Sequence, residues 1–122
     1  RELFQDRGRA YSQAFAFVRA RLPQDAVLGS FLAPMLHLYT GHHAVNLSFD
    51  PRGLAEAAVT HRIDYLFGGS RNYTGTDAWG EYLRWTNAHQ PGLLTPVFIN
   101  DHTGLSVWAV NRERAAELLK AD

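Results

Sequence analysis

The sequence contains no cysteine, which excludes disulfide bonds, a thiolate nucleophile and a cysteine-based zinc site. The chain also has no excess of positive or negative charge, because 12 Lys and Arg residues balance 12 Asp and Glu residues. A chain without a net positive field has no general attraction for nucleic acid or for an anionic lipid surface. We therefore expect no nucleic-acid function. The lack of cysteine suits both reducing and oxidising compartments, so it does not decide the location.

Long apolar runs and targeting signals are also missing. No stretch approaches the roughly 18 apolar residues that a membrane-spanning helix requires, and no signal peptide is present. The chain opens with Arg1-Glu-Leu-Phe, without an initiator Met, in a segment whose pattern is already helical. We interpret the chain as a fragment of a longer protein. Its bias towards Arg and Ala, with Lys120 as the single lysine, is typical of a GC-rich bacterial genome.

What is present is core material for one domain. The chain has 122 residues, 46% of them hydrophobic, which is a globular composition. A chain of this size buries roughly two thirds of its unfolded surface in a single domain. The sequence shows no repeat, low-complexity segment or internal boundary, so we expect residues 1–122 to form a single soluble domain.

Helical and strand patterns alternate along this domain. Tyr11, Phe15, Val18 and Leu22 form a helical stripe that ends before Pro23. Short apolar runs then predict the order αβαβαβαββα, with strands at 26–29, 44–48, 63–68, 97–100 and 106–110. Gly41 is expected to end a helix, and Asp50 and Asn111 are expected to cap the start of one. Such alternation favours a three-layer α/β/α sandwich around a mostly parallel five-stranded sheet that closes with an antiparallel hairpin.

A group of polar and glycine residues follows the carboxyl ends of the first three predicted strands. Open α/β sheets commonly bind ligands at this edge. It predicts a site for a small polar ligand, although a plain strand-to-helix loop explains the same residues. The candidate ligand-binding residues are Ser30, Asp50, Gly69, Ser70, Arg71 and Asn72.

Other candidate chemistry has a simpler explanation. His42 and His43 are adjacent on a predicted strand, so they point to opposite faces and do not readily share a metal ion. His42 also follows a helix C-terminus, where a cation is mildly favoured. Trp79 and Tyr82 could stack on a sugar, yet their spacing is typical of a core-facing helix stripe. The sequence therefore predicts no catalytic residue, no metal site and no cofactor.

Short phrases along the chain carry a resemblance to a known family. Each phrase lies at or just before the start of a predicted strand, and the hairpin predicted near the C-terminus is also part of the resemblance. The phrases are Pro23-Gln-Asp-Ala-Val-Leu28, Pro34-Met-Leu-His-Leu-Tyr-Thr-Gly-His42 and Asp64-Tyr-Leu66. Their order resembles that in the C-terminal extracytoplasmic domain of bacterial C-type membrane glycosyltransferases, the protein mannosyltransferase and aminoarabinose transferase type. His42 stands where Arg is commoner in those domains.

The resemblance implies a non-catalytic accessory role. In the full-length enzymes of this family, catalysis takes place beside the transmembrane helices with a polyprenyl-phosphate sugar donor, so no catalytic residue carries over. The partners implied are the transmembrane domain of the same polypeptide and, with it, a lipid-linked sugar or an acceptor. The location implied is the extracytoplasmic face of the membrane. The alternative that the residues leave open is a free-standing α/β module, or a small enzyme, that binds a polar metabolite at the strand edge.

Overall fold

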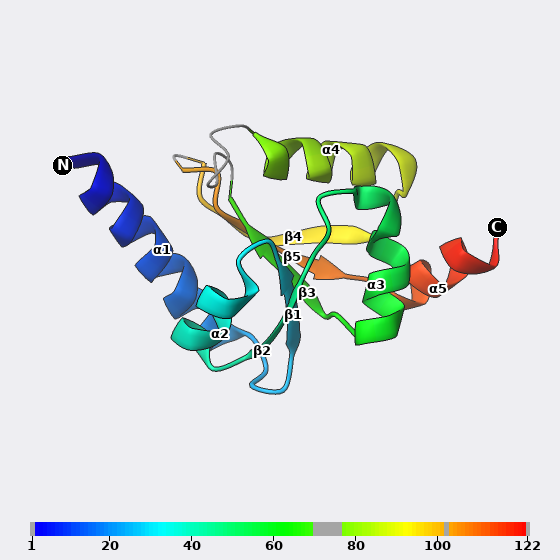
Figure 1. Ribbon diagram of the computed structural model, residues 1–122, viewed down its shortest axis with the longest axis horizontal. Coiled ribbons are helices and arrows are strands. Elements are labelled where there is room, and N and C mark those ends of the chain that lie inside the picture. The colour runs from blue at the N-terminus through cyan, green and yellow to red at the C-terminus, as the bar shows by residue number, and fades with distance from the viewer. Residues whose placement is uncertain (1, 70–76, 102, 122) are drawn as a thin grey trace.

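A mixed β-sheet with helices on its two faces forms the framework of the protein (Figure 1). The computed structural model describes residues 2–69, 77–101 and 103–121, with side chains from residue 11 onward. The strands are β1 (Val27–Ser30), β2 (His43–Asn46), β3 (Tyr65–Gly68), β4 (Leu94–Ile99) and β5 (Ser106–Val110). The helices are α1 (Glu2–Arg21), α2 (Ala33–Thr40), α3 (Leu54–His61), α4 (Ala78–His89) and α5 (Arg112–Lys120), and the 3-10 turn η1 (Pro51–Gly53) leads into α3. This order of elements agrees with the alternation predicted from the sequence.

Local capping residues set several helix ends. Gly41 ends α2 in the left-handed conformation, with φ of 76°, which glycine adopts without steric cost. The side chains of Asp50, Asp77 and Asn111 each accept a backbone N–H from the first turn that follows. The side chains that cap these turns therefore fix where α4 and α5 begin and where the chain turns after β2.

The strand order is β2-β1-β3-β5-β4. β1 pairs in parallel with β2 and with β3, whereas β5 pairs antiparallel with β3 and with β4. The predicted antiparallel hairpin is confirmed. The expected mostly parallel sheet is not, because β5 inserts between β3 and β4 and makes half of the pairings antiparallel.

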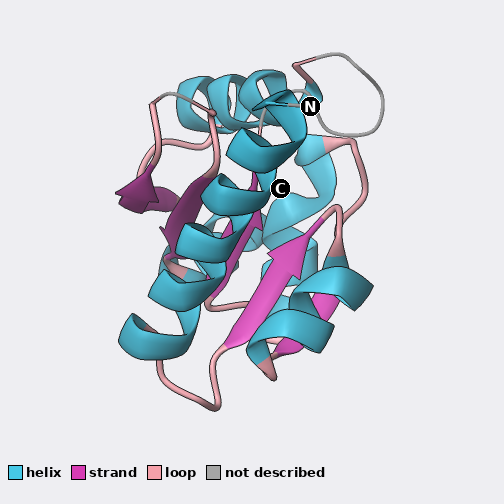
Figure 2. Ribbon diagram, turned by 90° about the vertical axis from the view of Figure 1, so that its left-hand side faces the viewer, coloured by secondary structure: helices cyan, strands magenta, loops and turns pink. Residues whose placement is uncertain are grey.

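Two buried clusters lie on opposite faces of this sheet. On one face, α1 and α2 pack against Leu28, Phe67 and Val107. On the other face, α3, α4 and α5 pack around Leu66 and Trp79. Figure 2 shows helices in front of the strands and behind them. Neighbouring residues in β3, such as Leu66 and Phe67, face different clusters because side chains alternate along a strand.

Candidate functional site

Asp64 ties together three strands at the edge where β1 and β3 begin. Its carboxylate oxygen Oδ2 accepts the Val27 N–H at 2.9 Å, and its own N–H donates to the Val27 carbonyl at 2.8 Å. The Asp64 carbonyl accepts the N–H of Val110, at the end of β5, at 2.9 Å. The other carboxylate oxygen, Oδ1, pairs with Arg112 Nη2 at 3.4 Å. Its Oδ2, N–H and carbonyl therefore join the starts of β1 and β3 to the end of β5, and its Oδ1 links this edge to the start of α5.

His42 makes a second link at the same edge. It is completely buried, and its Nε2 lies 2.9 Å from the Pro23 carbonyl oxygen. Because a carbonyl only accepts, Nε2 carries the hydrogen and donates. His42 follows the end of α2, as the sequence predicts, and its side chain lies in the interior, where it joins the start of β2 to the turn before β1. Its other ring nitrogen, Nδ1, has no hydrogen-bond partner within the described part of the chain.

Side chains from residues 34–42, the phrase that ends in His42, hold the turn before this residue. The Thr40 hydroxyl donates to the Leu36 carbonyl at 2.7 Å and accepts the His42 N–H at 3.2 Å. His37 Nδ1 lies 2.8 Å from the His42 carbonyl, so this nitrogen donates as well. His43 is exposed, which fits the expectation that the two adjacent histidines point in opposite directions.

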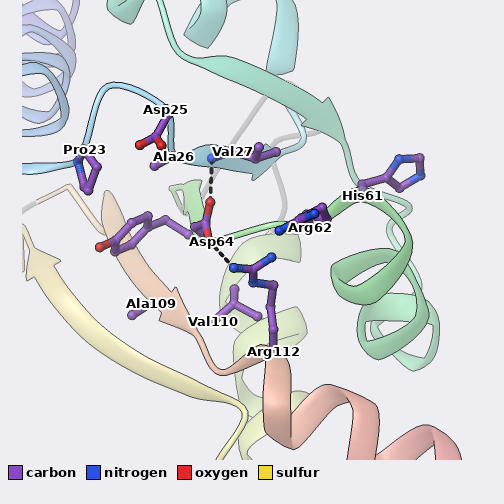
Figure 3. Close-up of a pocket in the computed structure, with 11 residues that line it drawn as sticks. Pro23, Asp25, Ala26, Val27, His61, Arg62, Asp64, Ala109, Val110 and Arg112 are labelled. Carbon is purple, nitrogen blue, oxygen red and sulfur yellow. Dashed lines mark hydrogen bonds and ion pairs between the residues drawn. The ribbon is translucent and has the colours of Figure 1, made fainter.

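A hollow of about 580 Å³ opens beside Asp64 (Figure 3). The turns before β1 and β3 line it, together with the end of β5 and the start of α5. Its charged residues are Asp25, Asp64, Arg62 and Arg112, and His61 lies at its border. Arg62 has a left-handed backbone, with φ of 57°. Across the residues that the structure describes, its guanidinium makes no hydrogen bond or ion pair.

The ligand site predicted from the sequence is at the opposite edge of the sheet. Ser30 ends β1 there, is fully buried, and accepts the Leu32 N–H at 3.0 Å through its hydroxyl oxygen. Asp50 is exposed and caps η1. Hydrogen bonds from the Arg52 side chain hold the pKa of the Asp50 carboxyl below its usual value. These two side chains are thus engaged in local turns.

The remaining candidates at that edge follow β3. Gly69 is buried, and a Cβ atom there would lie 2.6 Å from Leu105 Cδ2, so its absence of a side chain allows a close approach. Ser70, Arg71 and Asn72 lie outside the described residues. The ligand site predicted at this edge stays a prediction.

The aromatic residues near this edge belong mainly to the core. Trp79 and Tyr82 are buried, with their rings stacked at 6.0 Å between centroids. Burial raises the pKa of the Tyr82 phenol, and the nearby negative charge of Asp50 adds to the effect. Phe31 contacts both rings edge-on, and Phe49, which is 61% exposed, packs against Phe31. The core interpretation of Trp79 and Tyr82 therefore fits the structure.

Sequence reasoning missed the hollow at the amino edge, and with it Arg62 and Arg112. The sequence does show an arginine directly after the predicted helix, at the position where glycine usually ends a helix. The proximity of Arg112 was not visible, because it depends on β5 lying next to β3.

No cluster of three or more His, Cys, Asp or Glu residues suited to a metal ion occurs among residues 2–69, 77–101 and 103–121. In the same ranges, every helix is too short or too polar to cross a membrane. A comparison with models of known protein families found no match. A comparison with curated proteins found none either.

Proposed function

We propose that the chain is an extracytoplasmic accessory domain of a polytopic membrane glycosyltransferase that uses a polyprenyl-phosphate-linked sugar donor. In this proposal the domain is not catalytic by itself and needs no cofactor. It docks against the transmembrane domain of the same polypeptide and contributes to the recognition of the acceptor or of the lipid-linked sugar. Helices lie on both faces of the mixed sheet, which fits the three-layer arrangement that the alternation of helix and strand patterns predicts.

The observation that carries the proposal is the way in which the family-like phrases meet. The first phrase supplies the Pro23 carbonyl and the Val27 N–H. His42, from the second phrase, donates to that carbonyl, and Asp64, from the third, accepts that N–H. Segments that lie far apart in the chain thus form one connected unit at the amino ends of β2, β1 and β3. Such a unit gives the three phrases a common structural role, and in this chain His42 supplies the contact to Pro23 from a position where Arg is commoner in the family.

The same contacts favour an accessory role over catalysis. A general base or nucleophile needs a free lone pair within reach of a substrate. The Asp64 carboxylate is occupied by Val27 and Arg112, and the Ser30 hydroxyl oxygen is buried in its own turn. These side chains therefore support the fold. In a hydrolase or transferase, such side chains would be available to the substrate.

Two activity assays test the proposal. The full-length parent protein, reconstituted in lipid with a polyprenyl-phosphate sugar and an acceptor, is expected to transfer sugar. Deletion of the domain is expected to lower this transfer, while the purified 122-residue chain is expected to show none. Turnover by the isolated chain would contradict the accessory role.

The second candidate is a free-standing α/β module that binds a polar metabolite. The sequence predicts such a site at the carboxyl ends of the strands, whereas the hollow that contains Arg62 and Arg112 lies at their amino ends. This hollow favours the second candidate, because a concave site with converging polar groups is suited to a small polar molecule. The reading frame upstream of Arg1 separates the two candidates. Apolar membrane spans encoded there favour the glycosyltransferase, and an initiator Met shortly before Arg1 favours the free-standing module.

A further inference from the structure

The hollow at the amino edge of the sheet has a cationic side. Arg62 follows α3 and Arg112 begins α5, and both line the hollow (Figure 3). Arg62 is exposed, and its guanidinium makes no bond within the described residues. Among the described residues, Arg112 is held by a single 3.4 Å ion pair to Asp64, and its side chain is 40% exposed. A guanidinium offers five N–H donors, so both arginines have donors to spare for a ligand.

The acidic residues of the hollow divide into two kinds. Both carboxylate oxygens of Asp64 are already used, one by the Val27 N–H and one by Arg112. Asp25 is exposed and has no bond to the described residues. In Figure 3 it lies on the other side of Asp64 from Arg62. The hollow therefore has donors on one side and a free acceptor, Asp25, on the other.

The backbone of Arg62 supports a role for its side chain. Left-handed φ and ψ of 57° and 44° disfavour a residue with a Cβ atom, and glycine is the usual residue at this position after a helix. Within the described residues, Arg62 is the only non-glycine residue with positive φ. A strained residue that has a charged side chain in a hollow is a recognised feature of ligand sites.

We infer that this hollow binds a polyhydroxylated small molecule that carries one oxyanion, either a phosphate ester or a carboxylate. The oxyanion is bound by Arg62 with help from Arg112, since a guanidinium matches the geometry of both groups. Hydroxyl groups of the same molecule donate to the Asp25 carboxylate. The chain has no net charge, so this attraction is local to the hollow. The inference does not depend on the proposed glycosyltransferase role.

The test is a titration of the isotope-labelled chain, followed by NMR at low salt, with four probes. Glucose 1-phosphate and glucuronate are expected to shift the amide signals of Arg62, Asp64 and Arg112. Glucose, which has no oxyanion, is expected to shift none of them, and inorganic phosphate is expected to bind more weakly than glucose 1-phosphate. The two oxyanion probes distinguish a phosphate ligand from a carboxylate ligand.

Arg62→Gly separates loss of binding from loss of folding. This substitution removes the guanidinium and relieves the left-handed strain, so the variant is expected to melt no lower than the native chain. Its affinity for the oxyanion probes is expected to fall at least tenfold. Arg52→Gln is the matched control, since Arg52 is an exposed arginine at the opposite edge of the sheet and pairs with Asp50. This control is expected to bind like the native chain.

Asp25→Asn tests the other side of the hollow. The loss of a negative charge is expected to strengthen the binding of inorganic phosphate, whereas the loss of a strong acceptor weakens the binding of glucose 1-phosphate. The inference is overturned if neither oxyanion probe shifts the hollow's signals. It is also overturned if Arg62→Gly binds as well as the native chain, or if Arg52→Gln weakens binding to the same extent.

Discussion

Replacement of Asp64 by alanine is expected to destabilise the protein more than replacement of any other acidic residue of the hollow. The variant loses a hydrogen bond between the Val27 N–H and a charged acceptor, which contributes about 1.5–3 kcal/mol. It also loses the ion pair to Arg112, which is partly exposed and contributes about 0.2–1 kcal/mol. Together these losses lower the free energy of unfolding by about 2–4 kcal/mol, which corresponds to a fall in Tm of about 8–16 °C for a domain of this size.

Two further variants make this prediction specific. Asp64→Asn keeps an oxygen that accepts the Val27 N–H and loses the charge, so its free energy of unfolding is expected to fall by about 1 kcal/mol. Asp25→Ala removes an exposed carboxylate from the same hollow and is expected to change stability by less than about 0.5 kcal/mol. Denaturation by urea, monitored by circular dichroism, gives all three values. If Asp64→Ala unfolds at the same urea concentration as Asp25→Ala, Asp64 does not join the strands as described.

Three other predictions concern the core beneath α4. Gly68→Ala places a methyl group 2.6 Å from the buried Trp79 ring and is expected to cost about 1–3 kcal/mol in urea denaturation, whereas Gly53→Ala, with open space around it, costs little. Ser106→Ala leaves the indole N–H groups that donate to its hydroxyl without an acceptor. Its cost is about 1–3 kcal/mol, and an unchanged midpoint of denaturation would contradict the assignment. Because burial raises the pKa of Tyr82, the contribution of this residue to stability is expected to stay constant below about pH 10 and to fall above it, as the unfolded chain alone releases the phenolic proton. Alkaline denaturation of Tyr82→Phe should show a weaker fall.

The helix ends could be predicted because their causes are local. Gly41, Asp50 and Asn111 were each expected to cap or terminate a helical segment, and each does so in the structure. A cap requires only one side chain or one backbone conformation and the next three residues. Such signals lie within a few positions of one another in the sequence.

The start of β4 shows where a local signal misleads. The strand was expected from Val97 onward. Proline normally interrupts a ladder of hydrogen bonds, so Pro96 is a local signal against an earlier start. The structure begins it at Leu94, and Pro96 lies within it. β4 is at the edge of the sheet, where a missing N–H on the open side costs nothing, and a register shift follows between Pro96 and Phe98.

The sheet order and the amino-edge hollow could not be predicted, because both depend on contacts between remote segments. The position of β5 between β3 and β4 makes the sheet mixed and places Arg112 beside Asp64. In the sequence, Asp64 is recognisable only as the first residue of a phrase near the start of a predicted strand, where an Asp is ordinary. Its additional bonds to Val27 and Arg112 become visible only when the strands are assembled.

The most direct test of the proposed function is the size and location of the native protein. An antibody raised against the 122-residue chain, which has a mass of 13.7 kDa, would be used to probe cell fractions. The account predicts a much larger polypeptide in the membrane fraction, from which protease added outside the cytoplasmic membrane removes the domain. A polypeptide of about 13.7 kDa in the cytoplasmic fraction would contradict it.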